Sequence, residues 1–168
     1  MKWWRKLLSL TNRERLLLIE TFLLLGLVRL GLWLLPYQTL LHLLERISDR
    51  TLDSRYLRSG ISWNNRSQTH NALSRNSESE AIKLSSIVKA VNTSTYYMPG
   101  GAKCLARALT TQVLMKQQGY SPQFCIGVTK TELGKLEAHA WIEYQGQIVI
   151  GELPNLSLYL PLSSSKKT

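Results

Sequence analysis

The sequence predicts an α+β fold in which a leucine-rich helical region precedes a helix and a small set of β-strands. Two observations lead to this class. Apolar residues in the first third repeat at helical spacing, whereas those after Pro122 alternate along short runs as they do in strands. The chain has 168 residues, which suggests one domain with a helical appendage. Hydrophobic residues make up 44% of it, enough to bury a core.

The charge and the sequence motifs limit which partners and cofactors are expected for this protein. The chain has 21 Lys and Arg against 11 Asp and Glu, a net charge of +10, which favours acidic partners or anionic surfaces. Two cysteines cannot form a disulfide scaffold, and no close-spaced Cys and His set indicates zinc. The sequence also has no P-loop and no dinucleotide fingerprint. We therefore expect no metal and no cofactor. The basic residues come without a groove-reading motif, so nucleic acid is not an expected partner.

The first predicted helix follows a capping signal. Thr11 and Glu14 have the spacing of a capping box, in which each side chain binds a free backbone N–H of the first turn. A mostly leucine segment then runs over 16–35, and Pro36 disfavours helical geometry in the residue before it. Because no small-residue cleavage site follows the run, a signal peptide is not expected. A second amphipathic helix is predicted over 39–47.

The apolar surface of the leucine-rich segment is expected to be buried. Three surfaces could bury it: the protein's own core, a partner protein or a membrane face. A membrane span needs about 20 residues with few or no charges, and Glu20 and Arg29 interrupt this one. The first six residues, MKWWRK, have the composition of an interfacial anchor. We favour protein docking, because both charges are costly in lipid but can pair within an interface. The expected location is cytoplasmic, with membrane association through the N-terminal helices as the alternative.

The composition divides the chain into four parts. Residues 1–50 are the N-terminal helical region. Residues 51–79 are rich in Ser, Asn and Arg and are interpreted as a polar linker or surface connection. Residues 80–162 form the predicted core, which begins with a helix from Glu80 to Val91, and 163–168 form a disordered tail.

Cys104 is the first candidate for chemistry. A helix is predicted to start at about Ala102, after the break at Pro99-Gly100-Gly101, and to end near Gly119. Cys104 then lies in the first turn, where partial positive charge from free N–H groups stabilises a thiolate and lowers the thiol pKa. An ordinary small buried residue is the alternative.

Three strands are predicted after this helix, over 124–128, 138–144 and 147–150. Cys125 lies inside the first of them and is interpreted as structural. The dipeptide Gln145-Gly146 between the last two indicates a two-residue hairpin turn. With that turn, paired residue numbers sum to 291, so His139 is expected directly opposite Glu152.

Directly opposed residues share a sheet face, with Cβ atoms about 4.5–5.5 Å apart. A carboxylate there would fix the tautomer of His139 and favour its imidazolium form. The imidazole could then deprotonate a cysteine docked against that face, which is the arrangement of nucleophile, base and orienting group in cysteine hydrolases and acyltransferases. A structural His–Glu pair is the alternative.

These residues resemble a known family. The runs Cys104-Leu105-Ala106-Arg107-Ala108-Leu109, Gly127-Val128, Ala138-His139-Ala140-Trp141-Ile142-Glu143 and Ile150-Gly151 are similar to those of the peptidases of lasso-peptide biosynthesis. These McjB-type microcin-processing proteins have a transglutaminase-like core. The resemblance covers about 80–162, and the leucine-rich helices also look like those that precede that core.

The resemblance implies a papain/transglutaminase-like cysteine peptidase core that removes the leader from a ribosomally made lasso-peptide precursor. It implies Cys104 as nucleophile and His139 as general base. The family's third residue is usually Asp, and Glu152 stands at that position here. The implied partners are the precursor peptide, a separate leader-recognition protein and a lasso cyclase. The alternatives are an acyltransferase on the same fold and a non-catalytic scaffold that holds the precursor or the cyclase.

Overall fold

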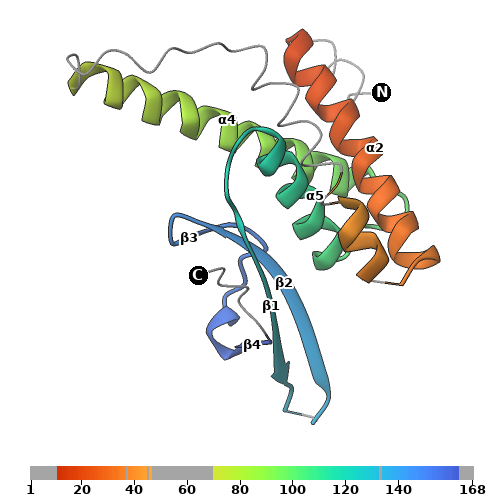
Figure 1. Ribbon diagram of the computed structural model, residues 1–168. Coiled ribbons are helices and arrows are strands. Elements are labelled where there is room, and N and C mark those ends of the chain that lie inside the picture. Colours follow the sequence, from red (N-terminus) through yellow and green to blue (C-terminus); the bar gives the residue numbers. More distant parts are fainter. Residues whose placement is uncertain (1–10, 37, 45, 47–69, 133, 163–168) are drawn as a thin grey trace.

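The computed structural model describes residues 11–36, 38–44, 46, 70–132 and 134–162. The predicted tail and the part of the predicted linker over 51–69 lie outside the described residues. The elements are α2 (Asn12–Leu34), a short helix over 38–44, α4 (His70–Tyr97), α5 (Cys104–Gln117), β1 (Gln123–Lys130), β2 (Leu136–Tyr144), β3 (Gln147–Ile150), the 3-10 turn η1 (Leu156–Leu158) and β4 (Leu160–Pro161). The helices gather at one end of an antiparallel sheet, and β1 and β2 extend away from them (Figure 1). The α+β prediction is confirmed.

Helix α2 begins and ends where its sequence signals place it. The Thr11 backbone N–H donates to a Glu14 carboxylate oxygen at 2.9 Å, and the Glu14 N–H donates to the Thr11 hydroxyl oxygen at 3.4 Å. The helix stops at Leu34, and Leu35 is extended ahead of Pro36. The capping box and the stop at the proline are both confirmed.

The protein's own core covers one side of α2. Thr21, Leu25 and Val28 are fully buried on that side. The apolar members of this contact form one cluster with the helix over 38–44 and with α5: Leu25, Val28, Leu40, Leu44, Ala106, Leu109 and Val113. The N-terminal helices therefore pack directly on the helix that carries Cys104.

Helix α4 is longer than predicted at both ends. It runs from His70 to Tyr97 rather than from Glu80 to Val91, so residues 70–79 are helical where a linker was expected. The Ser- and Asn-rich composition was the basis for that expectation. These residues are mediocre helix formers, but each costs less than about 0.7 kcal/mol relative to Ala. An anchored helix can extend through them.

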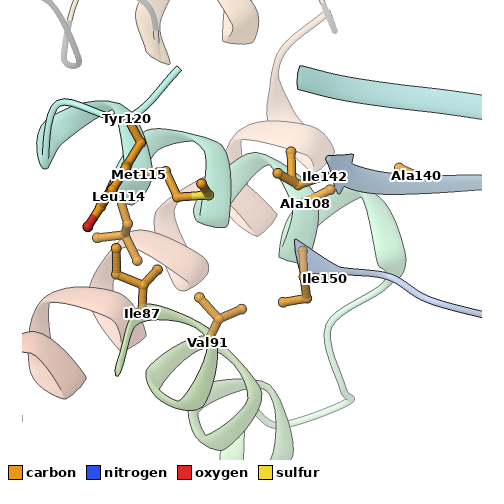
Figure 2. Packing of buried hydrophobic residues seen from close by; sticks show 9 residues of the cluster. All are labelled: Ile87, Val91, Ala108, Leu114, Met115, Tyr120, Ala140, Ile142 and Ile150. Atoms are coloured by element: carbon orange, nitrogen blue, oxygen red, sulfur yellow. The ribbon is translucent and has the colours of Figure 1, made fainter. Parts of the chain in front are cut away.

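A second cluster joins the helices to the sheet. It contains two residues of α4, three of α5, Tyr120 after α5, two residues of β2 and the last residue of β3 (Figure 2). Its members are Ile87, Val91, Ala108, Leu114, Met115, Tyr120, Ala140, Ile142 and Ile150. Because Ala140 and Ile142 alternate along β2, this cluster fixes which face of the sheet lies against α5.

The sheet has the strand order β3-β2-β1-β4. The hairpin turn is confirmed, since Gln145 and Gly146 have φ values of 52° and 77°, the two positive angles of a type I′ turn. The three predicted strands are present with bounds within two residues of those expected. Strand β4 was not predicted, because two residues, Leu160 and Pro161, are too few for an alternation signal.

The expected hairpin register is wrong beyond its second pair. Tyr144 pairs with Gln147 and Glu143 with Ile148, but the next pair is Ile142 with Ile150. One extra residue on β3 makes a β-bulge there, which shifts the ladder by one position. The ladder ends at Ile150, so the expected pair of His139 and Glu152 does not form.

Candidate active site

Cys104 is the first residue of α5, and its side chain is half-buried. No side chain caps this end of the helix at Lys103. The N–H groups of the first turn are therefore open to an incoming group and carry partial positive charge. Ala108 lies one turn later and packs in the cluster that contains Ala140 of β2. Cys104 therefore lies on the side of α5 that is turned toward β2.

The loop before Cys104 is held by α2. The guanidinium of Arg29 donates a hydrogen bond to the Pro99 carbonyl. A Cβ on Gly100 would lie 2.7 Å from the same guanidinium, so a side chain at this position would displace Arg29 from its contact with the loop. Gly100 and Gly101 have φ values of 73° and 65°, which also favour glycine. Arg29 therefore helps to position the start of α5, a role that the sequence did not indicate.

His139 lies on β2 between two aromatic rings. Its imidazole stacks with Trp141 at 6.3 Å between centroids and lies 5.7 Å from the ring of Tyr159. His139 Nε2 lies 2.6 Å from the Gly151 carbonyl oxygen. A carbonyl can only accept, so Nε2 carries the hydrogen and the Nδ1 lone pair of the neutral ring remains available as a base.

The main chain at Gly151 can reach the imidazole only because the residue is glycine. Its φ is 89°, and a Cβ there would lie 2.8 Å from both the Ala140 carbonyl oxygen and the Trp141 Cβ. Real Cβ atoms essentially never come that close. This glycine is part of the run Ile150-Gly151 that resembles the family, but nothing in the sequence indicates that its carbonyl orients His139.

Trp141 forms a platform beside the imidazole. Its ring lies over Gly127 of β1, where a Cβ would be 3.0 Å from the indole and 2.9 Å from the Tyr159 Cβ. The indole Nε1 donates to a carboxylate oxygen of Glu143 at 2.7 Å. The signal for this arrangement is the spacing of His139 and Trp141, which puts the two rings on one face of the strand.

The structure brings α5 and β2 together. It does not arrange Cys104, His139 and Glu152 as the predicted catalytic set. The imidazole shares the Trp141 face of β2, whereas Ala140 faces α5. Within the described ranges, no hydrogen bond joins Cys104 to His139. Glu152 is exposed, and it makes no hydrogen bond or ion pair with another described residue. The catalytic roles of these three residues stay predictions.

The second thiol has a different environment. Cys125 is buried in β1, and burial, together with the nearby Glu143 carboxylate, raises its pKa to about 11. A thiol with so high a pKa is almost entirely protonated at neutral pH and is a poor nucleophile. This environment agrees with the structural role expected for Cys125. Among the described residues, no group of three or more His, Cys, Asp or Glu side chains is arranged to hold a metal ion.

Comparison with known proteins identifies the class. Residues 31–164 match the model of the transglutaminase-like superfamily. The match covers most of the chain, so the protein belongs to this superfamily, which includes cysteine peptidases and acyltransferases. No curated protein and no solved structure shows significant similarity to the chain.

Proposed function

We propose that the protein is a cysteine peptidase that cleaves the leader from a ribosomally made lasso-peptide precursor. The observation that carries the proposal is the placement of Cys104 at the open start of a helix packed on the strand of His139. Membership of the transglutaminase-like superfamily supports a cysteine-based enzyme. The finer assignment, a papain-like core acting on a lasso precursor, rests on the sequence resemblance.

In the proposed mechanism His139 Nδ1 takes the proton from the Cys104 thiol, and the thiolate attacks the scissile carbonyl carbon. The imidazolium then gives that proton to the leaving amine as the C–N bond breaks, which leaves a thioester acyl-enzyme. Water attacks the thioester with Nδ1 as base and releases the carboxylic acid and the thiol. Backbone N–H groups at the start of α5 stabilise the oxyanion in both steps. The imidazole lies on the Trp141 face of β2, whereas Ala140 faces α5, so proton transfer requires a rearrangement that brings Sγ and Nδ1 within hydrogen-bond reach when the substrate binds.

The proposal includes the partners of the reaction. The substrate is the precursor peptide, a separate protein recognises its leader, and a lasso cyclase receives the product in the cytoplasm. Helix α2 packs on α5 as part of this protein's own core. This packing supports recognition of the leader by a separate protein.

The test is cleavage of a synthetic precursor by the full-length protein with its leader-recognition partner. We expect the wild type to release the leader and Cys104→Ala to be inactive but folded, since the change is small. Cys125→Ala is the matched control and should keep its activity. An acyl electrophile should modify Cys104, as shown by mass spectrometry.

The outcomes separate the alternatives. Cleavage by Cys104→Ala at the wild-type rate, or an adduct on Cys125, contradicts the assigned nucleophile. An acyl-enzyme that an added amine resolves much faster than water indicates an acyltransferase. Precursor binding without any adduct or cleavage indicates a scaffold.

A further inference from the structure

A stripe of aliphatic side chains follows the outer side of α2. Its members recur every three or four residues and are each 53–67% exposed: Leu16, Ile19, Leu23, Leu27, Leu30 and Leu34. This spacing puts them on one face of the helix over about five turns. In Figure 1, α2 lies at the outside of the group of helices. The core that buries Leu25 and Val28 leaves this stripe uncovered.

The opposite side of α2 limits how the stripe can be used. By length and composition the helix could cross a membrane, with a mean hydropathy of 2.0 in its most apolar window. Crossing would require Leu25 and Val28, both fully buried, to leave the cluster they form with α5. A surface that lies parallel to the helix can cover the stripe without disturbing that cluster.

The charges of α2 are compatible with lipid in this orientation. Arg29 is turned toward the protein, where it donates to the Pro99 carbonyl, so its charge does not enter the outer surface. Glu20 lies at the edge of the stripe and is exposed, so its carboxylate can stay on the aqueous side. Neither charge therefore has to enter the lipid in this orientation.

We propose that the stripe binds an anionic lipid bilayer, with α2 lying in the interface parallel to the membrane plane. The stripe is aliphatic and offers no hydrogen-bonding groups, whereas protein interfaces depend on Tyr, Trp and Arg anchors. Trp33, 82% exposed, stands near one end of α2, and Arg13 is exposed at the other. The sequence adds MKWWRK before the helix, and the chain has a net charge of +10. Basic and Trp residues beside an apolar face match an anionic interface.

The test uses the full-length protein and co-sedimentation with phosphatidylcholine vesicles that contain or lack phosphatidylglycerol. We expect binding to the anionic vesicles that weakens with salt. The double variant Leu23→Glu, Leu27→Glu should bind at least about tenfold less, since two exposed leucines lose their burial in lipid. The matched control is Ile82→Glu, which changes a residue 60% exposed on α4, off the stripe, and it should bind like the wild type.

Several results would overturn the proposal. Absence of wild-type binding is one, and equal loss in the Ile82→Glu control is another. A wild-type dimer in size-exclusion chromatography that Leu23→Glu converts to a monomer, without any vesicle binding, would show that a second copy covers the stripe. Circular dichroism of each variant confirms that α2 and the rest of the fold are intact. The readout is lipid binding, so it is independent of the proposed peptidase activity.

Discussion

The imidazole of His139 donates its Nε2 hydrogen to the main-chain carbonyl of Gly151, at 2.6 Å. The acceptor lies just after the β-bulge that displaces Glu152 from its expected position opposite the imidazole. A backbone carbonyl cannot ionise, and it can act only as an acceptor. The bulge therefore gives His139 a fixed partner that sets its tautomer without a charge.

The neutral imidazole of His139 is expected in the Nε2–H tautomer. The measurement is the pair of ring ¹⁵N chemical shifts in histidine-labelled protein, under conditions in which the imidazole is neutral. Because the partner is the Gly151 carbonyl, Glu152→Ala should show the same tautomer. An Nδ1–H ring in the wild type, or a change of tautomer in Glu152→Ala, would contradict this interpretation.

Activity should depend little on the Glu152 side chain. Glu152 is exposed, and we expect Glu152→Ala and Glu152→Gln to keep their cleavage rate within about threefold, well below the roughly 100-fold or greater loss typical when an acid–base group is removed. Single-turnover cleavage of the precursor gives the rate. If Glu152→Gln loses about 100-fold while Glu152→Asp keeps its rate, the carboxylate orients His139 as the sequence analysis predicted.

Gly151→Ala should destabilise the fold more than another glycine substitution at a positive φ. Gly146, with φ 77°, has open space around a Cβ, whereas a Cβ on Gly151 would clash with Ala140 and Trp141. We expect Gly146→Ala to cost about 1 kcal/mol and Gly151→Ala at least about 2 kcal/mol more. Urea denaturation of both variants measures the free energies of unfolding. Equal losses would show that the clash is relieved by a shift of β2.

The two thiols should differ in reactivity. At pH 8, a thiol with a pKa of about 11, as for Cys125, is thiolate in about one molecule in a thousand. Iodoacetamide at pH 8 should therefore modify Cys104 and leave Cys125 unmodified, as read by peptide mass spectrometry. Modification of both at equal rates in folded protein would refute this difference.

The raised pKa of Cys125 also predicts how stability depends on pH. The folded state keeps this thiol protonated up to about pH 11, whereas a free thiol ionises from about pH 9. The unfolded state therefore loses its proton first, and the free energy of unfolding should fall as the pH rises from 9 to 11. Cys125→Ala removes the thiol and should flatten this fall, at a cost of order 1 kcal/mol in packing. An unchanged slope in the variant would assign the fall to other groups.

Local signals predicted much of this fold. The Thr11 capping box, the stop at Pro36 and the Gln145-Gly146 turn all act within a few residues, so the sequence shows them directly. The β-bulge in β3 shifts the ladder between Glu143 and Ile142 of β2, and nothing in the alternation of 147–150 indicates it. The prediction of Glu152 opposite His139 failed for that reason.

The buried side of α2 also sets where the folding unit starts. The family match begins at residue 31, inside α2, so a chain cut there lacks Leu25 and Val28. Both side chains belong to one buried cluster with Leu109 and Val113 of α5, and their removal would expose part of that cluster to water. The truncated protein keeps Cys104, His139 and Glu152. We expect α5, which carries the thiol, to fray in it, and the truncated protein to become sensitive to proteases. The segment that matches the family is therefore shorter than the segment that α5 needs in order to fold stably.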